Sequence, residues 1–430
     1  MVYPRESLTN KLEPSYVFEA TIDPGWAEWI RASMNMSISR RSWLAGCLAT
    51  VASANAQNEP TDVNDEIHQL ADRAPLSMEF TGTTAADCRK WQHAFSAKLQ
   101  ELLGLSNPSL NRHQLPLILR IFADKTAAVA RSFEPPVHWE TSFEEAVDFD
   151  DHRRESLILK AEGLRPLPVY LLIPKQVGDR QRPGILALHG HGKWGNDPVV
   201  GIAKTLEAQT ELERAHYDYG LQLVRQGYVV AAPCFTPFGR RLDDAQAYGG
   251  EDPCAVTFVR MMALGRLLIA ENLRDALWSF ELLSRQATVD PKRIGCVGLS
   301  YGGRMTMMTA AMEPRIRVAV ISGALNLIQE RIEGRYGCGA QIIPGLLKFG
   351  DVPEISSLIA PRPCLWEVGT QDSLMVKDRI GIALERMRGA YQAFSAEDAL
   401  QVDSFDGDHR WNGVKAYPLL ATCLDPQSLR

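Results

Sequence analysis

The pentapeptide Gly298-Leu299-Ser300-Tyr301-Gly302 is the segment whose residue types and spacing best fit nucleophilic catalysis. An apolar run from Arg293 to Val297 precedes it, and Tyr301 to Met312 carries methionines at helical spacing, so we expect a strand, a sharp turn and a helix. A serine held at such a turn is strained, and the flanking glycines leave room for it. Ser300 is therefore the candidate nucleophile.

A histidine and a carboxylate follow at the ends of later strand-like runs. His409 lies just after the run Leu400 to Phe405, and no other of the nine histidines occupies this loop. It could take the proton of Ser300 and return it to a leaving group. Asp372 follows the run Cys364 to Val368 and could orient the imidazole.

Other carboxylates near these positions are weaker candidates for the acid. Glu367 is the rival of Asp372, but it lies inside a strand, where its side chain should project to a sheet face. The remaining acidic residues near the histidine are interpreted as solvated loop charges: Asp403, Asp406 and Asp408.

The oxyanion of an acyl-transfer reaction needs two backbone N–H donors. One should come from Tyr301, and the other from Gly190 or His191, in the glycine-rich loop His189 to Gly192 that follows a strand ending at Leu188. The alternatives are a simple glycine turn or a metal site on the two histidines. Since the chain continues Gly192-Lys193-Trp194 where an H-x-H metallohydrolase would have H-x-H-x-D-H, we predict no metal and no cofactor.

Three further residues are candidates for substrate binding. Trp194 and Trp411 flank the oxyanion loop and the base, and could form apolar or sugar-stacking walls or simply pack the loops. Arg304, one helical turn after the serine, could meet an anionic substrate group, although pairing with a carboxylate is the favoured interpretation. Insertions near residues 235–265 and 329–350 should shape the pocket without revealing the substrate.

The elements that must position these residues alternate between strand and helix. From Pro183 onward the periodicity predicts strands at 184–188, 228–232, 293–297, 318–322, 364–368 and 400–405, with helices at 217–226, 254–285 (interrupted near Gly265), 301–312 and 412–423. Two antiparallel strands, 156–161 and 167–173, precede them. We predict an α/β fold with a mostly parallel, doubly wound sheet and antiparallel leading strands.

The region before residue 151 is predicted to be an N-terminal helical extension, 57–150, on a catalytic domain, 151–430. Ala85 to Leu103 has a strong helical pattern, residues 57–75 read as a flexible lead-in, and a charged, proline-interrupted stretch runs to about Asp150.

Upstream, residues 34–56 resemble a twin-arginine (Tat) export signal. Arg40-Arg41 precede a short apolar run, and Ala54-Asn55-Ala56 offers a cleavage site. The segment is too short to span a membrane; the alternative is an amphipathic helix with exposed arginines. A start at Met34 or Met36 would make residues 1–33 untranslated or disordered, and lipidation at Cys47 is disfavoured. We expect a periplasmic or secreted protein.

Composition excludes some classes of partner. The chain has 430 residues and a net charge of -6, with no basic patch of the kind that a nucleic-acid binder needs. Without Cys47 seven widely spaced cysteines remain, without a C-x-x-C pair, so neither a disulfide framework nor a zinc motif is predicted, although one bridge is possible. The oligomeric state does not follow.

The order of oxyanion loop, Ser300, Asp372 and His409 is that of α/β hydrolases, and residues 150–425 resemble that superfamily. Within it, the chain looks like the dienelactone-hydrolase-like and acetyl-xylan-esterase-like bacterial proteins. The resemblance rests on residues 188–192, 289–294 leading into 298–303, and 359–363.

The resemblance implies a secreted serine esterase that acts through an acyl-enzyme on a small-molecule or polysaccharide ester. One reaction that it implies is the removal of acetyl groups from plant polysaccharide. Dienelactone hydrolases use a cysteine nucleophile, so Ser300 speaks against lactone specificity. Glucuronoyl esterases place a basic residue directly after the serine, where this chain has Tyr301. Two alternatives are a peptidase or other acyl hydrolase with the same triad, and an inactive hydrolase fold that acts as a binding protein.

Overall fold

The computed structural model describes residues 62–104, 133–175, 181–242, 252–334, 338–375 and 379–425. The predicted signal segment 34–56 and Cys47 lie outside these residues. The chain divides into the units Met1–Thr61 and Asp62–Arg430, and everything below concerns the second.

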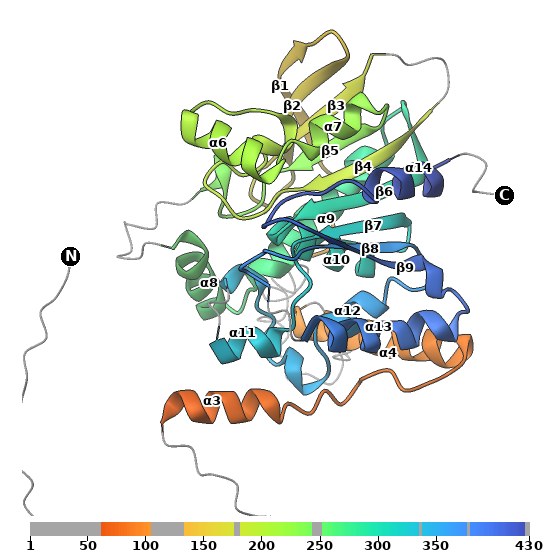
Figure 1. The fold of residues 1–430 in the computed structure, drawn as a ribbon. Coiled ribbons are helices and arrows are strands. Elements are labelled where there is room, and N and C mark those ends of the chain that lie inside the picture. The colour runs from red at the N-terminus through yellow and green to blue at the C-terminus, as the bar shows by residue number, and fades with distance from the viewer. Residues whose placement is uncertain are drawn as a thin grey trace, which may run out of the picture. The chain divides into compact units, whose positions relative to one another are not determined.

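A nine-stranded mixed sheet forms the centre of this unit (Figure 1). The strands lie in the order β1-β2-β3-β5-β4-β6-β7-β8-β9. Strands β1 to β3 and the β3–β5 pair are antiparallel, and the pairs from β5 through β4 to β9 are parallel. Their bounds are β1 Glu140–Asp148, β2 His152–Lys160, β3 Leu167–Pro174, β4 Arg182–Leu188, β5 Val229–Pro233, β6 Val289–Leu299, β7 Ile316–Ser322, β8 Cys364–Gly369 and β9 Leu400–Phe405.

Helices connect the strands and cover the sheet. Their bounds are α3 Val63–Asp72, α4 Ala85–Leu102, α6 Leu206–Ala215, α7 Tyr219–Arg225, α8 Pro253–Ala263, α9 Leu268–Ser284, α10 Tyr301–Met312, α11 Ile328–Gly334, α12 Val352–Ser357, α13 Ile380–Ala393 and α14 Ala416–Cys423. Short 3-10 helices are η3 Pro198–Val200, η4 Gly239–Arg241, η6 Gly339–Gln341, η7 Leu346–Lys348 and η9 Glu397–Ala399.

Alternate residues of the parallel strands enter two separate hydrophobic cores. Leu186 and Cys296 pack in the larger core with α4, α9, α10, α12 and α13, while Ile185 and Val297 pack with α7 and α14 in the smaller one. Because successive strand side chains point to opposite faces, this division shows helices on both faces of the sheet. The predicted doubly wound α/β fold is confirmed.

Two predictions about the N-terminal region need correction. The lead-in at 57–75 contains helix α3, whose N-cap Asp62 accepts hydrogen bonds from the N–H groups of Asn64 and Asp65. The charged stretch before Asp150 contains strand β1, a charged edge strand. Helix α4 forms as predicted and packs beside α12 and α13 (Figure 1); the boundaries at 56 and 150 stay predictions.

No single helix in the described ranges is long and apolar enough to cross a bilayer. Among the helices that the structure describes, one pair, α8 and α9, reaches the required length and composition together, and it is bent by 100° at the break between them.

Candidate active site

Ser300 lies on the turn between β6 and α10, in a backbone conformation that L-residues rarely adopt. Its φ is 63° and its ψ is -121°. A Cβ added at Gly298 would lie 2.4 Å from the carbonyl oxygen of Gly302, and one at Gly302 would lie 1.8 Å from that of Leu188. Both positions therefore exclude a side chain, which is the steric reason inferred from the sequence.

His409 and Asp372 come together at the carboxyl ends of β9 and β8. The Asp372 Oδ2 lies 2.7 Å from the His409 Nδ1, so the ring's Nδ1–H can donate to a carboxylate that is itself only 1% exposed. The other nitrogen, Nε2, is buried and hydrogen-bonds to no described residue. The arrangement leaves Nε2 able to exchange a proton with a neighbouring hydroxyl.

Gly323, directly after β7, forms one side of the space that holds the imidazole. Its φ is +58°, and a Cβ added there would lie 2.7 Å from the Cε1 and 3.0 Å from the Nδ1 of His409. The absence of a side chain at this position is thus a condition for the ring to lie where it does.

Glu367, the rival acid, does not contact the imidazole. It is fully buried in β8, and its carboxylate accepts hydrogen bonds from the N–H groups of Asn412, at 3.2 Å, and Gly413, at 2.8 Å. Burial raises its pKa to about 7. Glu367 therefore fixes the loop that follows His409, and Asp372 is the carboxylate that meets the ring.

The loop after β4 brings its backbone close to the serine. A Cβ added at Gly190 would lie 3.1 Å from the Cβ of Ser300 and 2.2 Å from the Tyr217 hydroxyl. His189 anchors this loop, because its Nε2 accepts a hydrogen bond from the N–H of Phe235 at 2.8 Å and burial lowers its pKa to about 4. His189 is therefore a neutral structural residue.

Tyr301 and His191, which flank the proposed oxyanion position, have firmly packed side chains. Their rings lie 5.0 Å apart, and the Tyr301 hydroxyl accepts a 2.6 Å hydrogen bond from the Asn272 amide. The His191 side chain lies beside Cys254 and Cys338. Hydrogen bonds with the Cys254 thiol and with His191 lower the pKa of the Cys338 thiol.

Two of the three candidate substrate residues are buried. Trp411 is 1% exposed, stacks on Tyr219 with ring centroids 5.0 Å apart, and donates its Nε1–H to Tyr417. It packs the loop, so its assignment as a substrate wall was wrong. Arg304 is 2% exposed and donates a 2.6 Å hydrogen bond to the Asn326 side chain. A buried guanidinium with this partner does not meet a substrate anion.

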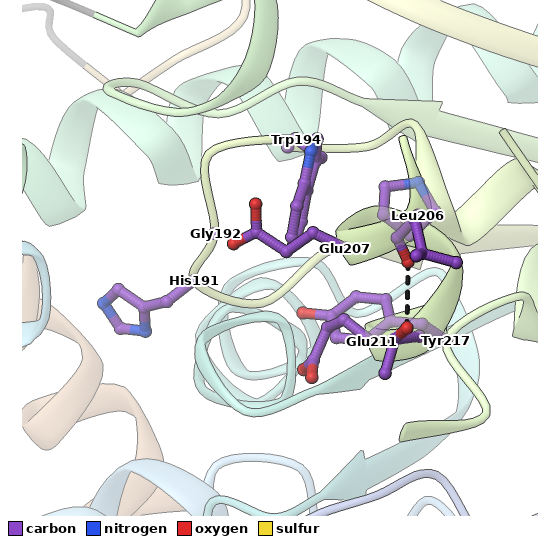
Figure 2. Close-up of a pocket in the computed structure, with 10 residues that line it drawn as sticks. His191, Gly192, Trp194, Leu206, Glu207, Glu211 and Tyr217 are labelled. Carbon is purple, nitrogen blue, oxygen red and sulfur yellow. Dashed lines mark hydrogen bonds between the residues drawn. The ribbon is translucent and has the colours of Figure 1, made fainter. Parts of the chain in front are cut away.

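Trp194, the third candidate, lines a cavity of about 620 Å³ beside the oxyanion loop (Figure 2). Both lining carboxylates are paired with cations: Glu207 with Lys193 at 2.6 Å, and Glu211 with Arg214 at 2.8 Å. The lining residues are His191, Gly192, Trp194, Gly195, Pro198, Leu206, Glu207, Thr210, Glu211 and Tyr217.

Helix α6 connects this cavity to the loop of His409. The Arg214 guanidinium donates to the Asp408 carboxylate at 2.7 Å, and the Trp411 N–H donates to the carbonyl of Ala215 at 3.0 Å. Sequence reasoning missed α6 and its carboxylates. The pattern of apolar residues in 206–215 could have indicated the helix, but not that it folds back against the base.

Comparisons with known proteins agree with this architecture. The sequence model of the prolyl oligopeptidase family (Peptidase_S9) matches residues 263–326, which include β6, the serine turn and β7. Among curated proteins, the chain is 29% identical over 252 residues to YtaP of Bacillus subtilis (strain 168), provisionally named a hydrolase; the match covers 58% of this chain and 79% of YtaP.

Solved structures show the same fold at low sequence identity. A Bacteroides fragilis NCTC 9343 protein, provisionally named an acetyl xylan esterase, superposes with a TM-score of 0.63 at 15% identity, covering 82% of this chain and 84% of that one. The methylesterase BT1017 gives a TM-score of 0.57 at 16% identity, covering 87% and 72%.

Proposed function

We propose that this chain, which has the fold of α/β hydrolases, hydrolyses carboxylic esters through an acyl-enzyme on Ser300. The observation that carries the proposal is the 2.7 Å hydrogen bond between His409 and Asp372, in a chain whose Ser300 lies on a strained strand-to-helix turn. These are the parts that a Ser-His-Asp mechanism requires.

In the proposed mechanism the Ser300 Oγ attacks the ester carbonyl carbon while the His409 Nε2 accepts its proton. Asp372 accepts the Nδ1–H bond and stabilises the imidazolium. The N–H of Tyr301 and an N–H of Gly190 or His191 stabilise the oxyanion. Collapse of the intermediate expels the alcohol, which takes the proton from His409, and water then repeats the two steps to release the acid.

The lining of the cavity supports a neutral carbohydrate ester as the substrate. Trp194 offers a flat apolar face, and the carboxylates of Glu207 and Glu211 with the hydroxyls of Thr210 and Tyr217 can bind sugar hydroxyls. Acetylated sugars and uronate esters both fit this lining, because the carboxyl of a uronate ester is uncharged until it is hydrolysed. We favour deacetylation because Tyr301 follows Ser300 at the position where glucuronoyl esterases have a basic residue.

The first experiment compares hydrolysis of p-nitrophenyl acetate by the wild type and Ser300→Ala. We expect the variant to lose nearly all activity; equal rates would refute the serine mechanism and favour the inactive binding protein. Acetylated xylan and methyl glucuronate then test the substrate class. Acetate release from xylan supports the proposal, and preference for methyl glucuronate contradicts the assignment to deacetylation.

A peptidase is the second candidate, because the matching family model is that of prolyl oligopeptidases. The same triad can cleave an amide. Peptide p-nitroanilides with proline before the scissile bond distinguish the two: turnover comparable with that of esters would favour the peptidase.

Export through the Tat pathway is part of the proposal. A reporter fused behind residues 34–56 should reach the periplasm, and Arg40→Lys with Arg41→Lys should retain it in the cytoplasm. Export that is unaffected by the double substitution would contradict the signal.

A further inference from the structure

Three side chains that can bind metals meet behind the oxyanion loop. The donor atoms of His191, Cys254 and Cys338 all lie within 4.8 Å of one another. His191 follows β4, Cys254 lies in the first turn of α8, and Cys338 directly precedes η6. Residues far apart in the sequence thus converge at one point.

The His191 imidazole does not belong to the substrate cavity, although the residue borders it. Figure 2 shows the ring pointing away from Trp194 and Glu211. The ring packs edge-on against Phe238, with centroids 5.4 Å apart, and lies 5.0 Å from the Tyr301 ring. Its Nε2 is buried, and its ring interacts with the Cys338 thiol. A buried imidazole that faces two thiols is placed as a metal ligand would be.

The two thiols are also buried, with residue exposures of 4% for Cys254 and 7% for Cys338. Two sulfurs and one imidazole nitrogen form a donor set that zinc prefers. In a tetrahedral zinc site these donors would be about 3.6–3.8 Å apart, so shifts on the order of 1 Å would complete the site. Three protein ligands leave a fourth position for water or another small ligand.

We propose that His191, Cys254 and Cys338 form a zinc site that ties the oxyanion loop to α8 and to the start of η6. Bound zinc would fix the imidazole of the residue whose own N–H is a candidate oxyanion donor. Zinc binding does not rest on the proposed esterase function, so the two proposals can fail separately. A Cys254–Cys338 disulfide is the competing use of the same sulfurs, but it gives no role to the imidazole that lies beside them.

The test uses the full chain, purified with reductant, stripped with a chelator and titrated with zinc chloride or cobalt chloride. We expect one zinc per chain after desalting and a higher thermal midpoint with zinc. Cobalt should give the charge-transfer absorption of thiolate ligation. Cys254→Ser and Cys338→Ser should each weaken zinc binding by more than the roughly 10–100-fold typical of outer-shell substitutions, and His191→Ala should do the same. Cys423→Ser is the matched control and should bind like the wild type.

The wild-type cobalt spectrum requires no variant, so a misfolded substitution does not obscure the result. The proposal is overturned if cobalt gives no thiolate charge-transfer band, or if the three variants and Cys423→Ser bind zinc equally. It is also overturned if peptide mapping without reductant finds Cys254 bonded to Cys338 and reduction of that bond creates no zinc affinity. Ester hydrolysis by the wild type and by Ser300→Ala is measured in parallel. A failure of the proposed esterase function is then detected separately from a failure of the zinc proposal.

Discussion

Replacement of Gly323 by alanine should move the imidazole of His409 although every member of the proposed triad keeps its own side chain. The new Cβ would lie 2.7 Å from the His409 Cε1, whereas ordinary van der Waals contact begins near 3.4 Å. The ring must therefore shift by about 0.7 Å. Its hydrogen bond to Asp372, 2.7 Å long, would lengthen or bend as a result.

A misplacement on the order of 1 Å at a catalytic group costs about 100-fold in rate. We accordingly expect kcat/KM for p-nitrophenyl acetate to fall by about 10- to 100-fold, which corresponds to roughly 1.4–2.7 kcal/mol in the activation barrier. Alanine at a positive φ also destabilises the fold by about 1–2 kcal/mol, an effect that must be separated from the clash.

Gly163→Ala provides that separation. Gly163 lies in the turn between β2 and β3 with φ +71°, and a Cβ added there would contact nothing within 4 Å. It should lower the thermal midpoint to a similar extent while leaving kcat/KM nearly unchanged. If Gly323→Ala retains wild-type kcat/KM, or if both variants lose activity equally, the imidazole does not act where we place it.

The remaining predictions concern the acid, the buried glutamate and the two tryptophans. Asp372→Asn should lower kcat by about 10³–10⁴-fold, because the neutral amide no longer orients the imidazole or stabilises its charge, while the exposed Asp406→Asn should act like the wild type; a loss below ten-fold would exclude Asp372 as the acid. Burial raises the pKa of Glu367 to about 7, above its ordinary 4.5, so the folded state holds a proton that the unfolded chain releases between these values. The resulting stability is fully present below about pH 4.5 and is lost as the pH rises through 7, so the thermal midpoint should fall across this window and Glu367→Gln should flatten the profile; an identical pH dependence in wild type and variant would refute this. Trp194→Ala should raise KM for acetylated xylan but not for p-nitrophenyl acetate, whereas Trp411→Phe should lower the thermal midpoint and leave KM unchanged; the opposite pattern would return Trp411 to the substrate site.

Much of the fold could be predicted because its signals are local. Helix α10 begins and ends at the residues that the pattern indicated, Tyr301 and Met312. The turn before it could be recognised because steric exclusion requires glycine at positions 298 and 302. The pairing of Asp372 with His409 could be expected because parallel strands bring their carboxyl ends to one edge of the sheet.

The direction of a side chain was harder to predict. Trp411 follows the base by two residues, yet its ring turns into the core, and Arg304 is buried against Asn326, 22 residues away. Neither contact has a local signature. The same holds for His191, Cys254 and Cys338, whose approach depends on the packing of segments separated by more than 60 residues.

Covalent labelling of the nucleophile tests the central claim most directly. A fluorophosphonate reacts with a serine that has a general base and an oxyanion site beside it. We predict one adduct per chain, mapped by peptide mass spectrometry to Ser300, absent from Ser300→Ala and much slower in His409→Gln. An adduct on another residue, or no adduct on a chain that still hydrolyses esters, would contradict the account.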